Sequence, residues 1–76
     1  MKEILEIVIK SLVDNQEEVS IKEINDEKST IFEVKVSEED MGKIIGKQGK
    51  MAKSIRTVMK AIASKDKKRI TIEFID

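Results

Sequence analysis

The chain has 76 residues, enough for one small domain with a limited hydrophobic core. It contains no Cys and no His, which excludes disulfides, Cys/His metal sites and the two commonest catalytic side chains other than carboxylates. Lys and Arg number 15, as do Asp and Glu, so the formal net charge is zero. No signal peptide or membrane-spanning stretch is visible, and we therefore expect a cytoplasmic protein.

The first half of the chain predicts one helix followed by a strand pair. Helical spacing of apolar residues in 2–14 predicts an amphipathic helix whose buried stripe is Ile4, Leu5, Val8 and Leu12. Apolar and polar residues alternate in 19–22 and again in 32–36, which predicts two strands. Turn-forming residues at 25–29 separate the strands, so we expect them to form a hairpin.

The second half predicts two helices and a third strand. Ser37 precedes three acidic residues and predicts the capped start of a short helix over 38–45. Gly46 stands where a C-terminal cap glycine is expected. From Lys50 to about Ser64, seven apolar residues share one helical arc and basic residues occupy the rest of the circumference. Alternation resumes in 70–75 and predicts the third strand.

The predicted order is α-β-β-α-α-β, an α+β fold in one domain over residues 1–76. Because a two-helix crossover precedes the third strand, this strand should run parallel to one hairpin strand in a mixed three-stranded sheet. Each strand has one apolar face. We therefore expect all three helices on one side of the sheet and water on the other.

Charge is distributed unevenly along the neutral chain. Residues 1–42 hold 5 basic and 12 acidic side chains, a net −7, whereas residues 43–69 hold 10 basic and 1 acidic, a net +9. A local patch sets the field that an approaching polyanion meets within a Debye length of roughly 8–10 Å. The asymmetry favours a nucleic-acid partner, and the alternative is a charged helix that only promotes solubility.

The positive block begins at a G-x-x-G loop, where Gly46 and Gly49 stand three residues apart. Glycines lack Cβ, so a sugar–phosphate backbone can approach the loop amides closely. The following helix points its free N–H groups and the positive end of its dipole at the same place. Lys43, Lys47 and Lys50 add full charges. The alternative is that Gly46 caps one helix, Gly49 relaxes a turn and the lysines are solvated.

The stretch I-I-G-K-Q-G-K-M-A-K-S-I at residues 44–55 resembles the core motif of the KH domain family, I-I-G-x-x-G-x-x-x-x-x-I. The order α-β-β-α-α-β resembles the bacterial type II arrangement of that family, and the likeness covers nearly the whole chain. It implies a single-stranded RNA-binding protein of RNA metabolism or post-transcriptional regulation, with RNA chaperone-like action. It also implies a homodimer or pairing with a larger KH-containing protein, and no catalysis, cofactor or small-molecule substrate.

The resemblance also implies which residues contact RNA. In the KH family the G-x-x-G loop clamps the backbone of about four nucleotides. Their bases lie in an apolar groove between the motif helices and an edge of the sheet. On this sequence the clamp is Gly46, Lys47, Gln48 and Gly49, the groove candidates are Ile44, Ile45, Met51 and Ile55, and the flanking charges are Lys43, Lys50, Lys53 and Arg56. Packing in the core is the alternative for the three isoleucines, and we favour it for Ile55.

Three other classes of protein fit less well. A P-loop needs four residues between its glycines and Ser or Thr after its lysine, but three residues separate Gly42 from Gly46 and Gln48 follows Lys47. A binder that stacks bases on its sheet needs exposed aromatics, and Phe32 and Phe74 lie on apolar strand faces. No pair of acidic residues suggests catalysis.

The serious alternative is a KH-fold module for dimerisation or partner docking, with little RNA binding of its own. Ile31 and Ile75 on the polar strand faces are candidates for such a contact.

Overall fold

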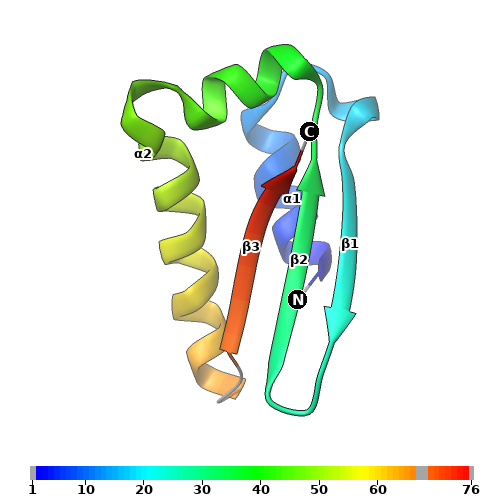
Figure 1. Cartoon of the computed structure of the whole chain (residues 1–76), viewed down its shortest axis with the longest axis vertical. Coiled ribbons are helices and arrows are strands. Elements are labelled where there is room, and N and C mark those ends of the chain that lie inside the picture. Colours follow the sequence, from blue (N-terminus) through cyan, green and yellow to red (C-terminus); the bar gives the residue numbers. More distant parts are fainter. Residues whose placement is uncertain (1, 67–68, 76) are drawn as a thin grey trace.

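The computed structural model describes residues 2–66 and 69–75, without the side chains of Lys47 and Asp66. A three-stranded sheet faces the viewer in Figure 1, α1 lies behind it, and α2 crosses one end of the sheet before it turns and runs beside β3. The elements in chain order are α1 (Lys2–Leu12), η1 (Gln16–Glu18), β1 (Ser20–Asn25), β2 (Ser29–Lys35), α2 (Glu38–Ala63), η2 (Ser64–Asp66) and β3 (Arg69–Ile75). None of the helices in this described part of the chain is long and apolar enough to cross a membrane.

The sheet has the order β1-β2-β3 and is mixed, as the sequence predicts. β1 pairs antiparallel with β2, with Ile21 opposite Val34, and β2 pairs parallel with β3, with Phe32 opposite Ile72. The hairpin turn is tighter than predicted, because β1 continues to Asn25, β2 already begins at Ser29, and the Asp26 N–H donates to the Ser29 carbonyl at 2.8 Å. β1 and β3 are the two outer strands.

The hydrophobic core lies between one face of the sheet and the helices, which confirms the predicted α+β arrangement. Burial alternates along β2 and β3 because successive side chains of a strand point to opposite faces. The core side chains are Leu5, Ile9, Val13, Ile21, Phe32, Val34, Val36, Met41, Ile44, Ala52, Ile55, Met59, Ala63, Ile70 and Ile72.

The predicted stripe of α1 is only partly right. Leu5 is buried and Val8 is partly buried, but Ile9 replaces Leu12 as the second fully buried residue. Ile4 is 41% exposed and Leu12 is 43% exposed. A narrow three-stranded sheet in a small domain covers only one side of α1, so apolar residues on its flanks remain at the surface. Val58, predicted on the apolar arc of the later helix, is likewise exposed.

α2 starts as predicted and bends in the middle. The Ser37 hydroxyl caps its start by accepting from the Asp40 N–H at 3.2 Å. Gln48 and Gly49 then take φ values of 64° and 70°, so α2 consists of a first segment (residues 38–47) and a second segment (50–63) that run in different directions in Figure 1. These segments correspond to the two predicted helices. The prediction that Gly46 forms the C-terminal cap is wrong, because the positive φ values that end the first segment begin two residues later, at Gln48.

Asp40 links the first segment of α2 to the end of α1 through hydrogen bonds. Its buried carboxylate accepts from the backbone N–H groups of Asp14 at 3.1 Å and Asn15 at 3.0 Å. It also accepts from the Ser37 hydroxyl at 2.9 Å and the Asn15 amide at 3.3 Å. Burial acts to raise the pKa of Asp40, but these hydrogen bonds outweigh it and lower the pKa to about 2. The cluster fixes the helix that leads into the G-x-x-G loop.

Candidate nucleic-acid interface

The G-x-x-G loop is the bend between the two segments of α2. Gln48 is exposed there, and Gly46 and Gly49 are half-buried. A Cβ atom at Gly46 or Gly49 would meet nothing within 4 Å, so the outer surface of the loop is open to a ligand. The side chain of Lys47 lies outside the described part of the structure. A non-glycine residue with positive φ, such as Gln48, is uncommon, and such strained residues cluster at functional sites.

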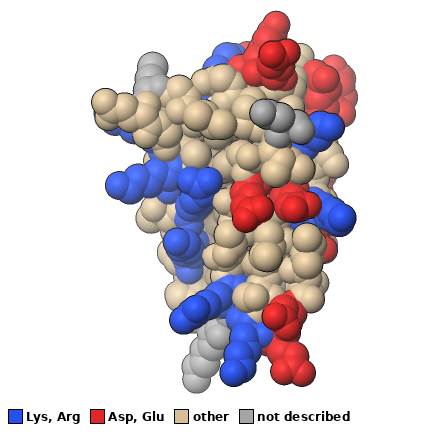
Figure 2. Space-filling view, viewed as in Figure 1, with Lys and Arg blue, Asp and Glu red and all other residues tan. Residues whose placement is uncertain are grey.

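Basic side chains extend from this bend along the second segment. Lys50, Lys53, Arg56 and Lys60 are all exposed. In Figure 2, Lys and Arg cover the left side of the molecule over this segment, whereas Asp and Glu lie over the sheet, the start of α2 and the β1–β2 turn. The charge asymmetry of the sequence therefore becomes a basic side of the folded domain.

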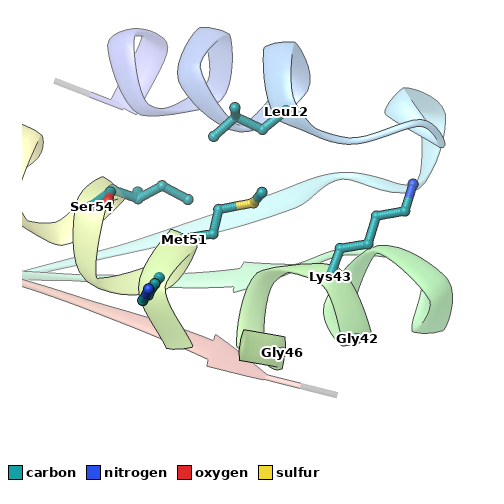
Figure 3. Close-up of a pocket in the computed structure, with 8 residues that line it drawn as sticks. Leu12, Gly42, Lys43, Gly46, Met51 and Ser54 are labelled. Carbon is teal, nitrogen blue, oxygen red and sulfur yellow. The ribbon is translucent and has the colours of Figure 1, made fainter. Parts of the chain in front are cut away.

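Lys43 points away from this basic side. Its ammonium forms an ion pair with the Asp14 carboxylate, and the side chain extends away from Gly46 in Figure 3. The hydrogen bond from Lys43 to Asp14 and the charge of Asp14 raise the pKa of Lys43. A ligand at the loop would compete with Asp14 for this lysine.

A groove separates the second segment from the outer edge of β3. Arg56 spans it, with Nε donating to the Ile72 carbonyl at 3.1 Å and Cζ lying 5.5 Å from the centroid of the Phe74 ring. A cavity of about 330 Å³ there is lined by Arg56, Lys60, Ile70, Thr71, Ile72 and Glu73. The contribution of Ile72 and Phe74 was not predicted, because no local pattern reveals which β3 residues lie opposite α2.

A larger apolar cavity lies on the α1 side of the bend (Figure 3). Its volume is about 640 Å³, and its lining consists of Leu12, Gly42, Lys43, Gly46, Lys50, Met51, Ser54 and Ile55. Met51 points into this cavity toward Leu12, so this predicted groove residue lies on the α1 side of α2.

The three predicted groove isoleucines have different environments. Ile44 is 1% exposed and Ile55 is also buried, so both belong to the core, as favoured for Ile55. Ile45 is 53% exposed beside the loop and is accessible to a ligand. Phe32 is fully buried and Phe74 is half-buried, so neither offers a free ring on the open face of the sheet. Among the described residues, no group of three or more acidic side chains is placed to hold a metal ion.

A G-x-x-G bend between two helix segments, within an α-β-β-α-α-β frame, defines a KH-type domain. The chain matches the family described as "KhpA/KhpB, KH domain" over residues 2–74, and it belongs to that family. It is 57% identical over 75 residues to the RNA-binding protein KhpA of Clostridium perfringens (strain 13 / Type A), which covers 99% of this chain and 100% of the relative.

Two more relatives show how far the similarity extends. The RNA-binding protein KhpA of Clostridium acetobutylicum is 56% identical, with 99% of this chain and 100% of the relative covered. The RNA-binding protein KhpA of Aquifex aeolicus is 41% identical, with 100% of this chain and 96% of the relative covered. No significant match was found among solved structures.

Proposed function

We propose that the chain is a cytoplasmic single-stranded RNA-binding protein that acts in RNA metabolism or post-transcriptional regulation as an RNA chaperone. The observation that carries the proposal is the pair of positive φ values at Gln48 and Gly49. Residues with φ near +65° cannot continue a right-handed helix, so the second segment of α2 starts anew after Gly49. Its first N–H groups then face the glycine loop, where a phosphate can accept hydrogen bonds. The KhpA relatives are named RNA-binding proteins.

We assign a role to each predicted site residue. The Gly46–Gly49 loop holds the backbone of the strand and adds the charge of Lys47, and Lys50, Lys53 and Arg56 neutralise phosphates along the second segment. Lys43 joins them once it leaves Asp14. Ile45 offers an accessible aliphatic contact to a base. Ile44 supports the loop from within the core, and Met51 supports it from the cavity on the α1 side.

Salt-dependent binding of a short labelled single-stranded RNA, followed by fluorescence anisotropy, tests the proposal. Release of counterions from four phosphates gives a slope of about −3 in a plot of log K against log salt concentration. A duplex of the same sequence should bind more weakly, because its bases are not available to the groove. Absence of salt-sensitive binding would favour the partner-docking alternative.

The two loop glycines should respond differently to substitution by Ala. Gly46 lies in the first segment without a positive φ, so G46A should keep the stability or raise it by up to about 1 kcal/mol. The added methyl group obstructs the approach of a phosphate, and we expect RNA affinity to fall by roughly 10-fold. G49A forces Cβ onto a residue with φ of 70° and should cost about 1 kcal/mol of stability. Urea unfolding and anisotropy measure both effects. Unchanged affinity of G46A would show that the strand does not approach Gly46.

We also propose that the chain pairs with itself or with a larger KH-containing protein of the KhpB type. One domain covers few nucleotides, and a second domain adds affinity by avidity. Apolar residues at the surface are candidates for pairing. Ile4, Ile7, Leu12 and Val58 are exposed on the helices, and Ile24 and Ile75 are exposed on the open face of the sheet, where the predicted contact residue Ile31 is half-buried. Light scattering after size-exclusion chromatography tests self-association, and a monomeric mass at micromolar concentration would contradict the homodimer.

A further inference from the structure

The backbone of β3 has polar groups that face the groove. The Arg69 N–H donates to the Lys28 carbonyl at 3.2 Å, so the backbone of Arg69 faces the β2 side. Successive residues of a strand direct their N–H and C=O groups to opposite sides. The backbones of Ile70, Ile72 and Phe74 therefore face away from β2, toward the second segment of α2.

Arg56 occupies the middle of this edge. Its Nε donates to the Ile72 carbonyl at 3.1 Å, and its guanidinium lies over the Phe74 ring. The bond joins a charged donor to a neutral carbonyl, and it uses one of the five N–H donors of the guanidinium. The side chain is exposed, so water competes for the same groups. Such a contact bridges the groove from α2 to β3 but can be exchanged for a stronger one.

A phosphate is a stronger acceptor for Arg56 than the Ile72 carbonyl. Hydrogen bonds between two charged groups are roughly twice as strong as neutral ones, and a guanidinium can bind phosphate with two parallel N–H groups. On the proposed function, an RNA strand held at the G-x-x-G loop runs along the second segment, with its bases in the space between that segment and β3. The guanidinium lies across part of that space when RNA is absent, on the Ile72 carbonyl and the Phe74 ring.

We propose that Arg56 is a gate of the RNA groove, an inference that rests on the proposed function. In the free protein it covers the Ile72 carbonyl and the Phe74 ring. When RNA binds, the bond from Nε to Ile72 breaks, the guanidinium moves onto a phosphate, and the carbonyl becomes free to accept a hydrogen bond from a base. Because only the open form binds RNA, the apparent affinity equals the intrinsic affinity multiplied by the fraction of protein that is open.

Nuclear magnetic resonance can follow the gate directly. The chain has two arginines, Arg56 and Arg69, so two Nε–Hε signals are expected, and the R69K variant identifies them. We expect a short single-stranded RNA to shift the Arg56 Nε–Hε signal and the Ile72 carbonyl signal together with the Gly49 amide signal. If RNA shifts the Gly49 amide signal but leaves the Arg56 Nε–Hε and Ile72 carbonyl signals unchanged, the gate is wrong and the proposed function still stands. Absence of any RNA binding would overturn the proposed function and the gate together.

The salt dependence of binding gives a second test. If Arg56 moves to a phosphate, R56A should reduce the magnitude of the salt slope by about 0.7, and R56K should restore it. The change in affinity should be small, because R56A removes the gate as well as the phosphate contact. Lys35→Ala, on the open face of β2, is the matched control and should leave the slope unchanged. If R56A has the same salt slope as the wild type, Arg56 does not bind a phosphate and keeps its contact with the Ile72 carbonyl, which would overturn the proposal.

Discussion

Replacing Lys47 and Gln48 with Asp should abolish the binding of single-stranded RNA and leave the melting temperature within a few degrees of wild type. The double variant places two carboxylates against the phosphates and removes one lysine, so we expect affinity to fall by roughly 100-fold or more at moderate salt. The fold should persist because the loop lies outside the core and Asp tolerates the positive φ of residue 48 better than most residues do. Fluorescence anisotropy and thermal unfolding measure the two properties.

A matched control separates the loop from overall charge. Changing Ser20 and Lys22 to Asp alters the net charge by the same −3, on exposed positions of β1 remote from the loop. This control should weaken binding only modestly, through long-range repulsion that salt screens. Equal losses in both variants would mean that overall charge governs binding, and retention of affinity by the loop variant would show that the clamp is wrong.

The sequence was sufficient to predict the fold because its strands alternate clearly. Burial of Phe32 and Val34 on one face of β2, and of Ile70 and Ile72 on one face of β3, follows directly from that alternation. α1 was predicted less well, since its apolar residues surround more of the helix than the sheet can cover. Periodicity then cannot decide whether Ile9 or Leu12 is buried.

The contacts of Arg56 show why part of the site could not be predicted. The basic character of the second segment is visible in the sequence, but the partner of Arg56 depends on the register of β3, 16 residues away. The same limit applies to Asp40. A carboxylate three residues after Ser37 indicates a helix start, and the Ser37 hydroxyl does bond to it. Its bonds to Asp14 and Asn15 require the end of α1 to lie beside α2, which only the folded chain reveals.

Asp40 should therefore be the most sensitive position for stability outside the apolar core. Asp40→Ala leaves the N–H groups of Asp14 and Asn15 without their acceptor in a buried setting, and we expect the melting temperature to fall by about 10 °C or more. Asp40→Asn keeps the volume but loses the charge and should be intermediate. Glu39→Gln changes the neighbouring exposed acid and is the matched control, with an expected shift of at most about 2 °C.

The pH dependence of unfolding tests whether the charge of Asp40 is responsible. The pKa of Asp40 is lowered from its ordinary 3.8 to about 2 in the folded protein, so the unfolded chain takes up the proton first as pH falls. The stabilising contribution is complete above pH 3.8 and is lost as pH falls through about 2. The difference in stability between wild type and Asp40→Asn should thus be constant from neutral pH down to about pH 5 and shrink below pH 4. A difference that persists unchanged to pH 2 would mean that shape, and not ionisation, makes Asp40 stabilising.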